Sequence, residues 1–170
     1  STRNQLISYS IDHDYLTTFN QTTRSWRYTP EDTSSLTRFW HHNSFVHPEG
    51  KVYTFGGYGN FYYKNRVLAF DPESRGYDSI PAKGTFSPRY LAAIGYEQKL
   101  DKLYLLGGYG SKSGQQTLSP DYYYELLEYN FADSTFSRIY DYAKTEMGFC
   151  FANSAVINDD QLYALAFSKY

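Results

Sequence analysis

The segment Val52-Tyr53-Thr54-Phe55-Gly56-Gly57-Tyr58-Gly59 occurs a second time, in the same pattern, as Leu103-Tyr104-Leu105-Leu106-Gly107-Gly108-Tyr109-Gly110. The two copies are 51 residues apart (103 − 52). In each copy a short apolar run ends in two glycines, which predicts a β-strand that ends where backbones crowd or where φ is positive. A period of this length is typical of folds that stack one small unit several times.

Other parts of the chain keep the same spacing. The stretch 70–77 matches 19–26. The stretch 89–91, which begins with Arg89, matches 38–40, which begins with Arg38. A later copy, at 129–136, is displaced by the polar segment 111–121, which we interpret as a loop insertion. Copies near both ends of the chain lack the diglycine. The sequence therefore predicts one unit repeated along nearly its whole length.

Each period reads as four short strands separated by turn signals, and no helical periodicity competes with them. The turns carry Pro, Gly and Asp, as in His47-Pro48-Glu49-Gly50. We predict an all-β protein. In the clearest period the strands, called A to D in order, are expected at 39–47, 52–56, 66–71 and 76–80.

This pattern resembles the kelch repeat, whose copies each fold as one four-stranded antiparallel blade of a β-propeller. The resemblance rests on the apolar strand before each diglycine, on an aromatic residue before an Asp or Asn turn, and on a second aromatic six or seven residues later. It implies a single propeller region over 1–170, with about three to three and a half blades. The blade pieces are expected at 4–30, 38–82, 89–141 and 148–170.

The length of 170 residues covers only part of a ring, because propellers close with four to eight blades of about fifty residues each. Two arrangements follow from this. The chain is either a portion of a larger kelch-type propeller, which we favour, or it self-associates through the open edges of its outer blades.

Composition limits the possible partners. Lys and Arg total 16 against 18 Asp and Glu, a net charge of −2, which disfavours a nucleic-acid surface. No segment approaches the roughly 18 apolar residues of a membrane span. Low charge with abundant Tyr, Asn and Ser resembles bacterial extracytoplasmic propellers, including sensor regions of signalling proteins, and weakly favours a periplasmic or secreted location.

A candidate ligand face follows from the order of the strands. In an up-and-down blade, the start of strand A and the loop between strands B and C lie at the same end, and the A–B and C–D turns lie at the other. The alternative is that the arginines cap strands and that the tyrosines fill contacts between blades. The expected ligand-binding residues combine aromatic surfaces with polar tips: Arg38, Arg89, Tyr58, Asn60, Tyr62, Tyr63, Tyr109, Lys112 and Tyr122.

Several sequence features imitate chemical sites. Gly107 to Gly114 lacks the glycine directly before lysine that a phosphate loop needs. Asp12-His13-Asp14 is expected in a turn, and His41, His42 and His47 as structural histidines, so we expect neither a metal nor any other cofactor. Cys150, in an apolar strand, is expected to be a buried, inert thiol.

We therefore predict a non-catalytic recognition module whose partner is a protein, a glycan or another small ligand. The alternative is a fragment of a carbohydrate-active, kelch-type propeller enzyme whose catalytic residues lie in other blades. The copper-dependent oxidases among kelch-type proteins use tyrosine, histidine and a cysteine-linked tyrosine, and this sequence does not reproduce that set in order.

Overall fold

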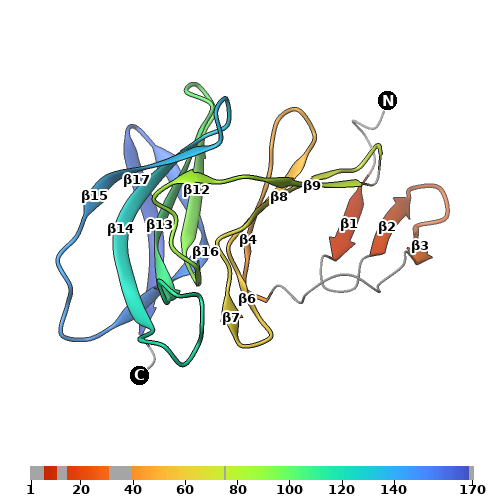
Figure 1. Ribbon diagram of the computed structural model, residues 1–170. Helices are drawn as coiled ribbons and strands as arrows, with labels where there is room; N and C mark the ends of the chain where they lie inside the picture. The colour runs from red at the N-terminus through yellow and green to blue at the C-terminus, as the bar shows by residue number, and fades with distance from the viewer. Residues whose placement is uncertain (1–5, 11–14, 31–39, 75, 169–170) are drawn as a thin grey trace. The chain divides into compact units, whose positions relative to one another are not determined.

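The computed structural model describes residues 6–10, 15–30, 40–74 and 76–168 (Figure 1). These residues form strands joined by turns and loops, without a helix among them, and this confirms the expected all-β class. Accordingly, that part of the chain contains no helix that could cross a membrane. The chain divides into two compact units, Ser1–Trp40 and His41–Tyr170.

The first unit holds a three-stranded antiparallel sheet in the order β1 (Ile7–Ser10), β2 (Tyr15–Asn20) and β3 (Ser25–Pro30). Asn20 builds the turn between β2 and β3, because its side-chain oxygen accepts hydrogen bonds from the amides of Thr22 (2.9 Å) and Thr23 (3.1 Å). Arg38 and the Asp12-His13-Asp14 turn lie outside the described residues.

The second unit begins with a four-stranded antiparallel sheet, in which the neighbouring strands follow chain order. Its strands are β4 (Asn43–Val46), β5 (Val52–Phe55), β8 (Val67–Asp71) and β9 (Gly76–Ile80). They fall within the four ranges predicted from the sequence. β4 starts later than expected because His41, at φ 51°, interrupts the extended backbone. A small hairpin, β6 (Tyr58–Gly59) and β7 (Tyr62–Tyr63), connects β5 to β8.

The rest of the second unit forms an eight-stranded mixed sheet. Its central part, β12 to β15, repeats the up-and-down order of the four-stranded sheet of β4, β5, β8 and β9. β16 lies parallel to β12. β11 pairs with β13, and β10 pairs with the outer edge of β15. The strands are β10 (Lys83–Gly84), β11 (Arg89–Tyr90), β12 (Ala93–Glu97), β13 (Lys102–Gly110), β14 (Asp121–Asn130), β15 (Thr135–Asp141), β16 (Phe149–Asn158) and β17 (Gln161–Ser168).

The hydrophobic core of this unit joins the two sheets. Phe55 and Val67, from β5 and β8, pack in one buried cluster with Leu103, Leu105 and Leu127 of β13 and β14. Alternation along each strand explains which residues enter the core, because every second side chain of β13 points to the same face of the sheet. Burial of these apolar surfaces is the main force that holds successive repeats together.

The two diglycines have nearly identical backbones. Gly56 and Gly57 have φ of 64° and 109°, and Gly107 and Gly108 have φ of 65° and 115°. The spacing of the strands before the diglycines is less regular. The positive-φ residues that precede β4 and β12, His41 and Leu91, are 50 residues apart (91 − 41) and not 51. The hairpin between the paired residues Ala93 and Leu106 is one residue longer (106 − 93 = 13) than the hairpin between Asn43 and Phe55 (55 − 43 = 12), which restores the period of 51 at the diglycines.

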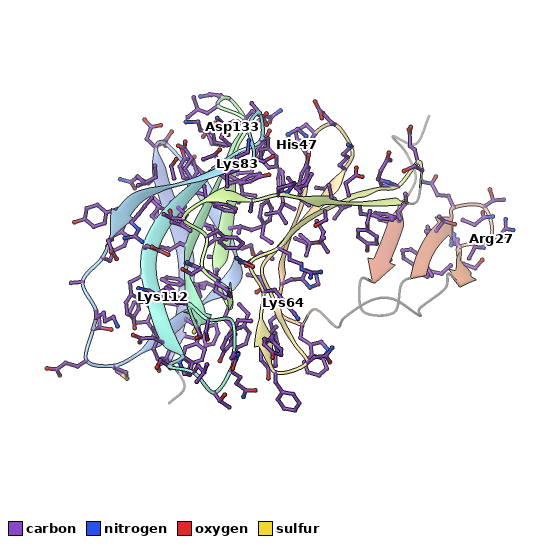
Figure 2. The ribbon with its side chains drawn as sticks, in the orientation of Figure 1. Arg27, His47, Lys64, Lys83, Lys112 and Asp133 are labelled. Carbon is purple, nitrogen blue, oxygen red and sulfur yellow. The ribbon has the colours of Figure 1, made fainter. Side chains whose placement is uncertain are left out.

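The two ends of the second unit carry different connections. Figure 2 shows Lys64 and Lys112, from the loops that follow the diglycines, at the lower end of the unit. His47 and Asp133, from the A–B and C–D turns, lie at the upper end with Lys83. This is the arrangement that the strand order predicts.

β17 lies at the end of the sheet, with β16 as its only strand partner among the described residues. Its sequence, from Gln161 to Ser168, contains neither a charge nor a proline. Three of its large apolar side chains are well exposed: Tyr163 (55%), Leu165 (77%) and Phe167 (45%). The equivalent positions of Tyr163 and Leu165 in β13, Tyr104 and Leu106, are partly buried.

Candidate functional site

The loops that follow the two diglycines pair with each other. Tyr62 forms a β-bridge with Gln115, and the amide of Tyr63 donates to the carbonyl of Gly114 (2.7 Å). The hydroxyl of Tyr58 donates to the side-chain oxygen of Gln116 at 2.5 Å. These contacts bring the loops of successive repeats together at one end of the unit, as the strand order predicts.

A group of five tyrosine rings, here called the tyrosine cluster, lies beneath this loop pair. The centroid distances are 5.6 Å for Tyr63 and Tyr90, 6.0 Å for Tyr63 and Tyr109, and 4.9 Å for Tyr109 and Tyr122, with Tyr58 5.4 Å from Tyr63. Burial, followed by the neighbouring tyrosines, raises the pKa of Tyr63 to about 12. Tyr63 therefore stays un-ionised at neutral pH, and the cluster acts largely as packing.

Apart from Arg38 and Arg89, the predicted site residues separate into two groups. Tyr58, Tyr63, Tyr109 and Tyr122 come together in the tyrosine cluster, and Tyr63 among them is only 6% exposed. Three others are exposed on the loops above the cluster: Asn60, Tyr62 and Lys112.

A groove of about 610 Å³ opens beside the tyrosine cluster, along β14. It exists because β15 reaches only to Asp141, which is paired with Glu125, while β14 continues down to Asp121. The segment after β15 contacts the strand again through the amide of Tyr142, which donates to the carbonyl of Tyr124 (3.1 Å). The lining residues are Ser87, Ser111, Lys112, Ser113, Leu118, Ser119, Asp121, Tyr122, Tyr123, Tyr124, Glu125, Arg138, Asp141, Tyr142 and Lys144.

Arg89 lies under the groove and is 1% exposed. Its guanidinium donates to Glu125 Oε1 (2.5 Å) and to the carbonyls of Gly107 (3.1 Å) and Ser87 (3.0 Å), and it lies 4.1 Å from the centroid of the Tyr123 ring. Burial lowers the pKa of Arg89, and the Glu125 carboxylate opposes that effect. Arg89 was expected on the ligand face, but the structure places it beneath that face, where it holds Glu125.

Glu125 joins this buried arginine to an exposed one. Its second oxygen, Oε2, accepts from Arg138 Nε at 2.8 Å, and Arg138 Nη1 also reaches Asp141 at 3.3 Å. Glu125 is 5% exposed, and a carboxylate at that depth requires its cationic partners. The network fixes the Arg138 guanidinium at the wall of the groove.

A second ion pair, between Lys144 and Asp121, lies at the lower end of the groove. Hydrogen bonding between the two raises the pKa of Lys144 and lowers the pKa of Asp121. Both groups are therefore charged at neutral pH. Because both side chains are largely exposed, the pair orients the groove wall more than it stabilises the fold.

The sequence features that imitate chemical sites have ordinary structural roles where they are described. His47 Nε2 lies 2.8 Å from Asp101 Oδ1, and the hydroxyl of Tyr96 donates to that same oxygen. Cys150 is buried, as expected. The residues after Gly107 lead through a loop to a strand. Within the described ranges, no three His, Cys, Asp or Glu side chains gather as metal ligands.

Sequence reasoning missed most of the groove wall. Glu125, Arg138, Asp121 and Lys144 belong to the stretched copy, and the preceding copy does not carry matching charges. Its equivalent of Glu125, for example, is Arg66. The run Tyr122-Tyr123-Tyr124 was the available signal, because three consecutive tyrosines place aromatic rings on both faces of a strand.

A comparison with protein-family models finds no match to the chain. A comparison with curated proteins finds no significant match either.

Proposed function

We propose that the chain is a non-catalytic recognition module that binds a saccharide in the groove along β14, as part of a larger kelch-type propeller. The groove is the observation that carries the binding proposal. Its volume lies within the range of roughly 300–1,000 Å³ that is typical of small-ligand sites. Its wall combines aromatic rings with fixed hydrogen-bonding groups, and sugars offer both apolar faces and hydroxyls to such a surface.

The propeller part of the proposal is supported by the way in which successive A strands meet. β12 and β16 run parallel and adjacent, as the inner strands of neighbouring blades do. The side-chain amide of Asn43, at the start of β4, donates to the carbonyls of Ala92 (2.7 Å) and Asn153 (2.8 Å). A single buried side chain thus ties together the first strands of three consecutive repeats.

A binding experiment with matched variants tests the saccharide site. A glycan array would identify ligands, and calorimetry would then measure their affinity for the wild type, Tyr142→Ala and Tyr163→Ala. The two tyrosines are similarly exposed, at 50% and 55%, but only Tyr142 lines the groove. We expect Tyr142→Ala to weaken binding about tenfold, which corresponds to loss of one aromatic contact, and Tyr163→Ala to leave it unchanged. Equal affinities in all three proteins would reject the groove.

A further inference from the structure

We infer that the saccharide bound in the groove is acidic and that Lys112 binds its anionic group. This inference rests on the proposed function and specifies its ligand. It starts from the charges of the groove wall, where three cations (Lys112, Arg138 and Lys144) face three carboxylates (Asp121, Glu125 and Asp141). Glu125 is shared with the buried Arg89, so the complete network carries one positive charge more than it carries negative charges.

The excess charge can be assigned to one side chain. Lys144 is paired with Asp121, and Arg138 is paired with both Glu125 and Asp141. None of the ion pairs among the described residues includes Lys112, and its side chain is exposed. An ammonium group at the rim of a groove, without a counter-ion from the protein, favours an anion on the ligand.

The backbone on both sides of Lys112 is held in place. Ser111, 2% exposed, donates its hydroxyl to the carbonyl of Leu118 (2.5 Å) and lies 2.9 Å from the hydroxyl of Ser113. Ser113 in turn accepts from the amide of Gln115 (3.2 Å). The loop is therefore ordered before a ligand arrives, which reduces the entropy that binding must remove.

The remaining groups of the groove fit a sugar with one acidic group better than they fit a polyanion. Arg138 is already neutralised by two carboxylates, so its remaining N–H groups suit hydroxyl oxygens. The whole chain carries a net charge of −2, which opposes the long-range attraction of a highly charged ligand. A saccharide with a single uronic acid residue, and therefore a single carboxylate, matches both conditions.

The test compares an acidic and a neutral saccharide of equal length. Calorimetry with galacturonic acid and with galactose would be run on the full chain and on Lys112→Met, Lys112→Arg and Lys83→Met. Lys83 is exposed and lies at the opposite end of the unit, so its variant controls for the loss of one positive charge (Figure 2). We expect the wild type, Lys112→Arg and Lys83→Met to prefer the acid at least tenfold, and Lys112→Met to lose that preference.

The possible outcomes separate this inference from the proposed function. Equal affinity of the wild type for the two saccharides overturns the acidic ligand but leaves the saccharide site intact. A preference for the acid that survives in Lys112→Met overturns the role of Lys112. Binding of neither saccharide, with no ligand on a glycan array, overturns the proposed function itself.

Discussion

The sheet of β4, β5, β8 and β9 and the sheet of β12 to β15 are built from successive copies of one repeat, and they differ most after the diglycine. In the first sheet the chain turns back through the short β6–β7 hairpin. In the second, β13 and β14 extend well beyond their counterparts, and a loop of ten residues connects them. Only this extension of β14, which β15 does not cover, has room for the groove.

The difference extends to single positions. Glu125, one residue before the point where β14 pairs with Leu106, is buried between two arginines. The corresponding position before β8 is Arg66, which is exposed. The repeat thus supplies the scaffold, and an insertion in one copy, together with its own charged residues, supplies the candidate site.

The largest expected effect comes from breaking the network that only the second sheet has. Arg89→Met leaves Glu125 buried with Arg138 as its remaining partner, and we expect a loss of about 3 kcal/mol in the free energy of unfolding. Urea denaturation followed by circular dichroism would measure it. Arg66→Met, at the equivalent position before β8, should change the free energy of unfolding by less than about 0.5 kcal/mol.

A double variant checks the cause of that loss. Arg89→Met combined with Glu125→Leu removes the buried charge as well as its partner, and most of the lost stability should return. If the double variant is no more stable than Arg89→Met, the packing of the guanidinium against Tyr123, and not the charge, holds this region together.

The diglycines should behave alike in the two sheets. A Cβ on Gly56 would lie 2.6 Å from the carbonyl oxygen of Arg89, and a Cβ on Gly107 would overlap the ring of Phe151. Both residues also have positive φ, so we expect each alanine variant to lose about 2–3 kcal/mol of unfolding free energy. Gly50→Ala, with positive φ but open space around it, should lose only about 1 kcal/mol.

These three alanine variants also test the equivalence of the repeats. Thermal or urea unfolding would measure the losses of unfolding free energy. Matching losses at Gly56 and Gly107, both larger than the loss at Gly50, support a common steric role for the two glycines. A loss at Gly107 alone would mean that crowding is a property of the stretched copy.

The smallest effect concerns the contact that joins the two sheets at the end opposite the groove. Hydrogen bonds from His47, and then from Tyr96, lower the pKa of Asp101. The contact therefore stabilises the fold above the pKa of about 4 of unfolded Asp, and this stabilisation is lost as the pH falls through the lower folded-state value. Because Asp101 is more than half exposed, we expect the contribution to stay below about 1 kcal/mol.

Asp101→Asn removes the titrating group and serves as the measurement. Between pH 6 and pH 3, the stability of the wild type should fall more steeply than that of the variant. Parallel curves would show that this carboxylate contributes nothing to the acid sensitivity of the fold.

The strands and turns were predictable from the sequence because they depend on local patterns. The diglycines and the Asn20 turn are examples, since each combines a residue type with a backbone geometry that few other residues accept. The start of β4 was placed too early because nothing in the sequence marks His41 for a positive φ.

The candidate site was only partly predictable. The meeting of the two loops follows from strand order, and Tyr58, Tyr63 and Tyr109 were found in this way. The burial of Arg89 was not foreseen, because a charged residue is buried only when its partner is present, and Glu125 lies 36 residues away in the sequence. Such a pairing depends on tertiary structure that no local pattern encodes.

The bare edge of β17 has a consequence for how the protein behaves during folding. An uncharged strand with unpaired backbone groups recruits other strands, and native edges are usually blocked by charge, proline or a covering segment. β17 has none of these blocks among its described residues, so it is an edge from which the sheet can grow. The growth is productive when the strand that arrives is its proper neighbour, and it leads to aggregation when the strand comes from another unfolded chain.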